Sequence, residues 1–258
     1  MKNGSGAEPS RQRTHARFSE LFKVQVRLAL REPYGLLGLA LPIGLLVVFW
    51  YIGVRNPGSV GSSGLTILEL YIPTLLVISY GGLALYGMPT TLVRDREIGW
   101  LRRVSTTPVS PSRLLAGQLL LNLVIAAAAT VIIIVLGAAL FGAPLKIGLL
   151  FVGVAALAIV EIFSLGLVVT ALAPTQQAAQ YISGGLFFLL LFLSGLWIQP
   201  VLLSGASQAV FYYSPGGAAA RALLYSIFNV APPSTTIATM IVYTAVFALV
   251  SVRYFRWE

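Results

Sequence analysis

Few residues of this chain have side chains that could do catalytic or metal chemistry. The only histidine, His15, lies in a polar N-terminal stretch, and the chain has no cysteine. Without cysteine neither a disulfide nor a thiolate metal site can form. A membrane-embedded enzyme would need clustered catalytic groups, and one histidine in a tail does not provide them. We therefore expect no catalytic residue, metal site or cofactor on this chain.

A charged run is the first feature that could carry a function. Seven charged residues fall within the twenty residues from Arg94 to Arg113. Residues 94–104 can form a short helix that Pro108 ends, and Pro111 can then begin the next helix. A short charged helix that is joined to two long apolar helices could transmit the movement of a soluble partner to them. The alternative is a loop that only fixes the membrane topology by its charge.

Polar side chains inside apolar stretches, or at their ends, are the second such feature. Glu161 lies in mid-stretch, where a carboxylate costs a few kcal/mol unless it faces protein or water. It could line a transport path, or it could be structural, bonded to a neighbouring helix or held protonated. Tyr80 and Tyr86 could line the same path, and Gln176 and Gln180 could make a cargo entrance polar. Ordinary helix packing and interfacial solvation are the alternatives for these four residues.

The elements that must position these residues are membrane spans. Hydrophobic residues make up 57% of the 258 residues and charged residues 10%, whereas a soluble domain carries about 25% charge. A span needs roughly 20 apolar residues. Six stretches qualify: 35–54, 68–92, 114–141, 147–172, 178–198 and 235–252. We predict an all-α integral membrane protein with six transmembrane helices.

The distribution of lysine and arginine predicts the orientation of these spans. With the N-terminus inside, 14 of these residues fall on the inner side, and only Arg55, Lys146 and Arg221 fall on the outer side. Positive residues concentrate in cytoplasmic segments, so the net charge of +9 is explained without nucleic acid. We expect a multi-pass protein of the cytoplasmic membrane of a prokaryote, with both termini in the cytoplasm.

The segment before the first span has the pattern of a basic amphipathic helix. Over residues 15–32, apolar and basic side chains recur at helical spacing, and they include Arg17, Phe18, Phe22 and Arg27. Such a helix can lie in the membrane interface. A solvated helix packed on protein is the alternative. Residues 1–14 are polar and are predicted to be a disordered cytoplasmic tail.

The charged run resembles the loop before the third span of ABC-2-type transporter permeases. That family has Glu-Arg-Glu-x-Gly-Thr-Leu, followed by Thr-Pro-Val/Leu-Ser. Here Asp95 replaces the first Glu and Trp100 replaces the usual Thr. The matching positions are Arg96, Glu97, Gly99, Leu101, Thr107, Pro108, Val109 and Ser110.

A second resemblance lies farther along the chain. The Ser-Gly pair ahead of Pro200 is similar to the end of the family's fifth span. Pro215, with Arg221 after it, is similar to the family's Asn-Pro hairpin, although Ser214 replaces the asparagine. The two motifs occur in the family order, and the resemblance covers nearly the whole chain. It implies that residues 201–228 form an outer re-entrant hairpin of short helices before the last span.

The resemblance implies the permease subunit of an ATP-driven exporter, similar to drug-resistance exporters of the daunorubicin type. The chain has no Gly-rich loop followed by Lys-Ser/Thr, so ATP and Mg²⁺ are expected on two copies of a partner ATPase. A second permease chain, identical or paralogous, is expected as well. The segment 94–104 becomes the coupling helix that docks on the ATPase, through Arg94, Asp95, Arg96, Glu97, Gly99, Leu101, Arg102 and Arg103. The helix at 15–32 is expected to touch the same subunit.

The expected cargo is a hydrophobic or amphipathic small molecule, such as a drug, an antibiotic or a lipid, although the family also exports polysaccharide. A proton-coupled secondary transporter that uses Glu161 is the alternative function. The absence of inverted repeats or paired broken spans counts against it, as does the expectation of a single buried charge, Glu161.

Overall fold

The computed structural model describes residues 33–56, 58–60, 64–97, 111–141 and 145–254. Within these ranges every named element is a helix, and the only β-pairing is an isolated bridge between Ser59 and Thr66. The predicted all-α membrane fold is therefore confirmed. The predicted interface helix at 15–32 and the segment 98–104 of the predicted coupling helix lie outside the described residues.

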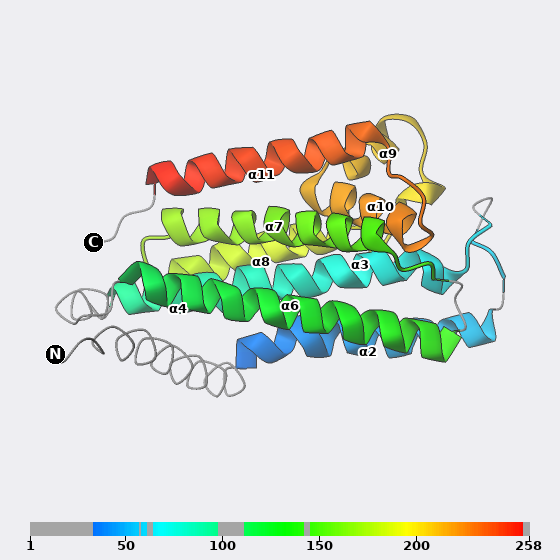
Figure 1. The fold of residues 1–258 in the computed structure, drawn as a ribbon, viewed down its shortest axis with the longest axis horizontal. Helices are drawn as coiled ribbons and strands as arrows, with labels where there is room; N and C mark the ends of the chain where they lie inside the picture. Colours follow the sequence, from blue (N-terminus) through cyan, green and yellow to red (C-terminus); the bar gives the residue numbers. More distant parts are fainter. Residues whose placement is uncertain (1–32, 57, 61–63, 98–110, 142–144, 255–258) are drawn as a thin grey trace, which may run out of the picture.

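Among the described residues, five long apolar helices and one shorter apolar helix form the bundle (Figure 1). Five are long and apolar enough to cross a membrane, and the apolar stretch described in the first, Ala40–Arg55, is shorter. The helices are α2 (Pro33–Arg55), α3 (Ile67–Gly82), the π-helix η1 (Leu83–Gly87), α4 (Met88–Glu97), α6 (Pro111–Phe141), α7 (Leu149–Leu172), α8 (Gln176–Leu193), the 3-10 helix η2 (Pro200–Leu202), α9 (Gly205–Tyr212), α10 (Pro215–Ile227) and α11 (Ser234–Tyr254).

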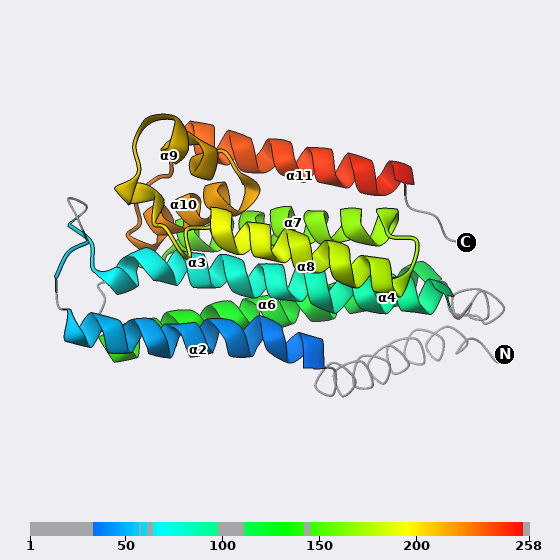
Figure 2. The same ribbon diagram turned by 180° about the vertical axis from the view of Figure 1, so that it is seen from behind.

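The second span runs through the centre of the bundle. The helices α3, η1 and α4 follow one another without a break over Ile67–Glu97, and they pack against α2, α6, α7, α8 and α10. Figure 2 shows α8 beside this central helix from behind. Nearly every side chain of α3 is buried, including the polar residues Thr74 and Ser79. Polar groups within a span need protein partners, and both have one here: the Thr74 hydroxyl donates to the Ser194 carbonyl, and the Ser79 hydroxyl donates to the Gly38 carbonyl.

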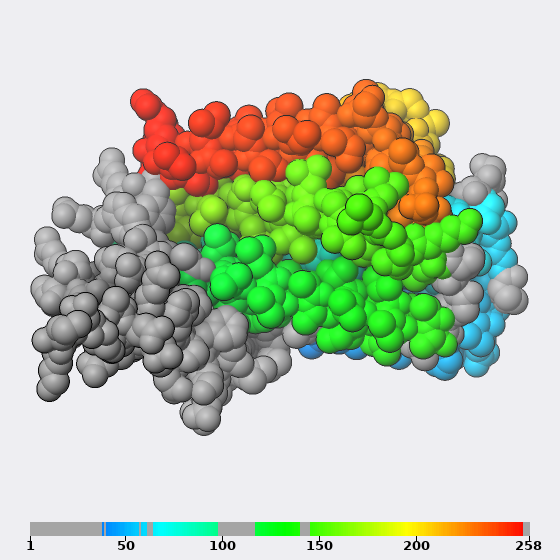
Figure 3. Space-filling model, in the orientation of Figure 1, coloured from blue at the N-terminus to red at the C-terminus, as the bar shows by residue number. Residues whose placement is uncertain are grey.

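The outer helices present apolar side chains on their free surface. Val131 in α6 is 61% exposed, and Leu249 in α11 is 70% exposed. Figure 3 shows α6, α7 and α11 side by side over one face of the molecule. Apolar surface of this extent suits contact with lipid, since lipid chains take the place of water around a membrane span.

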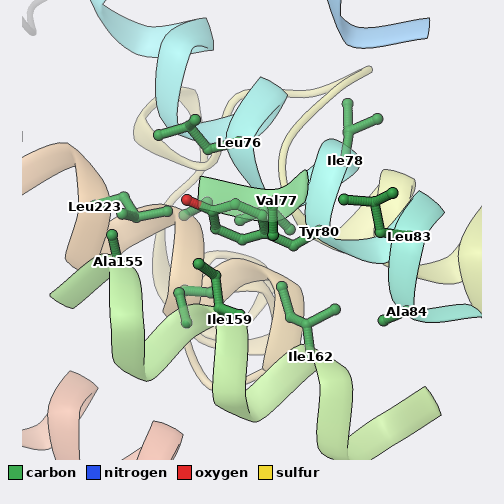
Figure 4. Packing of buried hydrophobic residues seen from close by; sticks show 14 of the residues in the cluster. Leu76, Val77, Ile78, Tyr80, Leu83, Ala84, Ala155, Ile159, Ile162 and Leu223 are labelled. Atoms are coloured by element: carbon green, nitrogen blue, oxygen red, sulfur yellow. The ribbon is translucent and has the colours of Figure 1, made fainter. Parts of the chain in front are cut away.

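The core lies where α3, α7 and α10 meet. Tyr80, Leu76, Ile159, Ile162 and Leu223 are buried in one cluster there, and Figure 4 shows them converging from the three helices. At Gly166 of α7 an added Cβ would collide with the backbone carbonyl of Ala84 in η1. This glycine therefore permits a close approach of α7 to the π-helix.

The bundle has two distinct ends (Figures 1 and 2). At the α4 end, α4 stops, α6 begins, α7 turns into α8, and α11 stops. At the hairpin end, α9 and α10 lie between α8 and α11, within the range predicted for the outer hairpin. The helix α10 packs against α3, α7, α8 and α11, so the hairpin is part of the bundle rather than a peripheral loop.

Two boundaries differ from the sequence prediction. The fifth span was expected to reach residue 198, but α8 ends at Leu193 because Gly195 adopts a φ of +93°, which ends the helix. Residues Arg94–Glu97 were expected to begin a separate coupling helix, but they form the last turn of α4. Neither glycine nor proline separates them from the predicted end of the span at residue 92. Pro111 begins α6, as predicted.

Candidate functional site

The last turn of α4 touches the connection between α7 and α8. The Arg96 guanidinium donates a hydrogen bond to the backbone oxygen of Ala173. The Glu97 Oε1 atom accepts one from the backbone nitrogen of Gln176, at 3.0 Å. We call these two contacts the α4 junction. They join residues 77 and 79 positions apart in the sequence.

The α4 junction matches the charges of two helix ends. Ala173 is the C-terminal cap of α7, and Gln176 is the first residue of α8. A helix leaves its last carbonyls and first N–H groups unpaired, with partial negative charge at the C-terminus and positive charge at the N-terminus. Arg96 places a cation at the first of these ends, and Glu97 places an anion at the second. Arg96 and Glu97 therefore bond to backbone groups on both sides of the turn between α7 and α8.

Further contacts fix the geometry of this turn. Thr175 caps α8 by accepting a hydrogen bond from the Ala178 nitrogen at 3.1 Å. Val93, Ala173 and Ala179 form a small buried cluster beside it. The turn between α7 and α8 is thus held from the α4 side by polar and apolar contacts.

The other residues predicted to couple the chain to an ATPase are described only in part. Arg94 and Asp95 lie in the same turn of α4, with Arg94 Nε and Asp95 Oδ1 3.8 Å apart. Gly99, Leu101, Arg102 and Arg103 lie outside the described residues, as do Arg17, Phe18, Phe22 and Arg27. The sequence analysis did not foresee that Arg96 and Glu97 bind the α7–α8 turn, because that contact is set by tertiary packing.

Glu161 is fully enclosed by protein. Its exposed fraction is 0%, and within the described residues neither carboxylate oxygen has a hydrogen-bond partner. It lies in α7, which packs against α4, α8, α10, α11 and the central helix. In this conformation the carboxyl group faces no open path, and its role in transport stays a prediction.

The two tyrosines predicted for the transport path have different surroundings. Tyr80 is buried, with its hydroxyl 2.8 Å from Thr130 Oγ1 of α6. Because the Thr130 hydroxyl donates to the Ala126 carbonyl, Tyr80 is the donor in this pair. The contact matches the helix-packing alternative. Tyr86 is half-buried and meets the Phe187 ring edge-on, with centroids 5.3 Å apart.

The two glutamines predicted at a cargo entrance lie in the first turns of α8. Gln176 and Gln180 are both half-buried, at the α4 end of the bundle. Only the backbone of Gln176 takes part in the α4 junction. No group of acidic and histidine side chains suited to a metal occurs in the part of the chain that the structure describes.

A second buried carboxylate escaped the sequence analysis. Glu69 is 8% exposed and lies in the first turn of α3. It accepts hydrogen bonds from the backbone nitrogen and the hydroxyl of Thr66, at 2.7 and 2.8 Å. The signal was present as Thr-x-x-Glu before an apolar run, which is a capping box. Glu161 is therefore not the only buried charge, although it is the one without a partner among the described residues.

The predicted hairpin residues lie at the hairpin end. Pro200 starts η2, and an added Cβ on Gly195 would lie 2.8 Å from its ring. Pro215 starts α10, and Ser214 caps this helix by accepting from the Gly217 nitrogen at 3.1 Å. Arg221 follows in α10, half-buried. Ser214 thus supplies the capping oxygen that an asparagine would supply in the family motif.

Comparison with known proteins agrees with this architecture. A family model described as ABC-2 type transporter matches residues 16–228. No curated protein shows a significant match to the chain. The matched region contains the α4 junction, the central helix and the hairpin. The chain therefore belongs to the ABC-2 type transporter family, as a membrane-spanning permease component.

Proposed function

We propose that this chain is the permease subunit of an ATP-driven exporter in the cytoplasmic membrane. Two permease chains, identical or paralogous, pair with two ATPase subunits, which bind ATP and Mg²⁺. The proposed cargo is a hydrophobic or amphipathic small molecule, such as a drug, an antibiotic or a lipid. The proposal rests on the family match over residues 16–228 and on the α4 junction.

The proposed orientation of the chain in the membrane rests on the distribution of lysine and arginine. The α4 end is placed in the cytoplasm, because 14 of the 17 lysine and arginine residues of the sequence fall on that side when six spans are threaded. The hairpin end, with Arg55, Lys146 and Arg221, then faces outward. Both chain termini are cytoplasmic in this arrangement.

The α4 junction supports a mechanism for coupling. ATP closes the ATPase pair, which pushes on the segment that follows Glu97. Arg96 and Glu97 pass the displacement to the end of α7 and the start of α8. Three spans then move together, and the exporter shifts toward an outward-open state. Such a shift requires that ATP bind one state better than the other.

Co-purification tests the proposal. The tagged chain is extracted from its native membrane, and the eluate is assayed for a ~30 kDa partner, a typical size for one ATPase domain, and for vanadate-sensitive ATP hydrolysis. Both should appear with the wild-type chain. A variant with Arg96→Glu and Glu97→Arg keeps the net charge and should insert normally, but it should not transport. A chain that purifies alone and inert in several detergents would refute an ATPase partner, and wild-type transport by the double variant would remove the coupling role.

The burial of Glu161 favours one alternative function, that of a proton-coupled secondary transporter. A carboxyl group that is fully enclosed, without a hydrogen-bond partner among the described residues, could exchange a proton in another conformation of a proton-coupled secondary transporter. Transport would then follow the proton gradient without ATP, and Glu161→Gln would abolish its pH dependence. An unchanged pH profile in Glu161→Gln would return this residue to a structural role.

A further inference from the structure

A cavity of about 400 Å³ lies at the hairpin end of the bundle. The first turns of α3, the segment after α8, and α10 line it. Most of its wall is apolar, with Leu70, Pro73, Leu224 and Phe228 among the lining residues. The volume is within the range of small-molecule sites, which combine apolar walls with a few polar groups.

Among the described residues that line this cavity, Arg221 is the only charged one. Its guanidinium carbon lies 4.0 Å from the ring centroid of Tyr212 and 6.0 Å from that of Tyr225. A guanidinium stacked on aromatic faces keeps the N–H groups at its edge available, because the ring contact uses only the flat face. The two tyrosine rings therefore hold the Arg221 guanidinium in place, while its N–H donors stay available to a ligand.

No anion of the described part of the chain neutralises Arg221. The structure gives it no ion pair with a carboxylate of that part. Glu69, at the same end of the bundle, is bonded to Thr66. Burial raises the pKa of the Tyr212 hydroxyl, and the opposing effect of Arg221 is smaller. Tyr212 is therefore an uncharged phenol at neutral pH, and the cavity keeps a net positive charge.

We propose that this cavity binds the anionic end of an amphiphile, a phosphate or carboxylate group carried on an apolar chain. The planar Arg221 guanidinium can bind such a group by donating two parallel hydrogen bonds to its oxygens. The apolar wall around Leu224 and Phe228 covers the first carbons of the chain. A membrane lipid and an exported solute share this chemistry. The binding site is independent of the direction and energy source of transport.

Binding of octyl phosphate to the full-length chain in phosphatidylcholine nanodiscs tests the proposal by titration calorimetry. Octanol carries the same chain without the charge. Loss of a charge-assisted contact should weaken octyl phosphate binding about tenfold or more in Arg221→Gln. Arg55→Gln is the matched control, since Arg55 also lies at the hairpin end over a tyrosine ring, 5.2 Å from the Tyr51 centroid, but does not line the cavity.

The two sources of the ligand are separated by adding phosphatidylglycerol to the nanodiscs. If this lipid blocks octyl phosphate binding, the occupant is a lipid head group, and if binding persists, the occupant is a soluble anion. Either result supports the proposal. Leu224→Trp fills the cavity but keeps the charge of Arg221, and it should also abolish binding. This second variant keeps the proposal testable if the Arg221→Gln chain is unstable. Octyl phosphate that binds no better than octanol, or that binds all variants equally, would overturn the proposal.

Discussion

Removing the charges of the α4 junction should loosen the turn between α7 and α8 without unfolding the bundle. In Arg96→Gln the guanidinium that donates to Ala173 is lost and the side chain becomes shorter. Glu97→Gln keeps the side-chain length and an oxygen that can accept from Gln176, but it removes the negative charge. The apolar core is untouched, since neither residue belongs to it.

The expected magnitude differs between the two variants. Arg96 is half-buried, and a hydrogen bond from a charged donor contributes about 1.5–3 kcal/mol. Glu97 is exposed, so solvent reduces its contribution to about 0.5–1 kcal/mol, which includes its effect at the α8 N-terminus. The turn should therefore open about ten- to a hundredfold more often in Arg96→Gln, and about two- to fivefold more often in Glu97→Gln, since 1.4 kcal/mol is a factor of ten.

Amide hydrogen exchange with mass spectrometry measures this opening directly. Peptides that cover residues 173–180 should exchange faster in both variants, and peptides from the middle of α7 should not change. Arg253→Gln is the control, because it removes a positive charge from the exposed last turn of α11 at the same end of the bundle. Exchange in 173–180 should be unchanged in this control.

Equal exchange rates in the wild-type chain and in both junction variants would refute the reasoning, since the charges of Arg96 and Glu97 would then not hold the turn. Faster exchange throughout the chain would also refute it, because the substitutions would then act on the whole fold. In either case the proposed route from the ATPase to α7 and α8 would lose its physical basis.

Three further predictions concern the packing of the bundle. Tyr80→Phe removes the hydrogen bond to Thr130 and should lower the free energy of unfolding in detergent by about 1 kcal/mol, whereas an unchanged stability would mean that the contact is not made. Gly166→Val should prevent correct folding, because any Cβ there meets the Ala84 carbonyl, and a normal elution profile in size-exclusion chromatography would contradict this. Ser214→Ala removes the cap of α10 and should cost about 1 kcal/mol in thermal unfolding, while Ser214→Asn should retain most of the stability.

The membrane class and the positions of the spans could be read from the sequence. Long apolar runs with few charges determine a helix locally, because every backbone polar group must be satisfied within the span itself. Pro111 at the start of α6 was likewise a local signal. The end of α8 was misplaced because the apolar run continues past Gly195, and only the backbone conformation shows the stop.

The meaning of the polar residues depended on tertiary structure. The sequence marked Arg96 and Glu97 as part of a charged run, and Arg221 by its resemblance to the family's hairpin motif. It marked Glu161 as a carboxylate within a span, where charge is costly. The sequence could not show that Arg96 and Glu97 bind the ends of α7 and α8. Nor could it show that Glu161 is enclosed by protein and that Arg221 lines a cavity. These outcomes depend on which helices pack together, and such contacts join residues far apart in the chain. Local pattern therefore determined the helices, and the packing of the bundle decided what each charge faces.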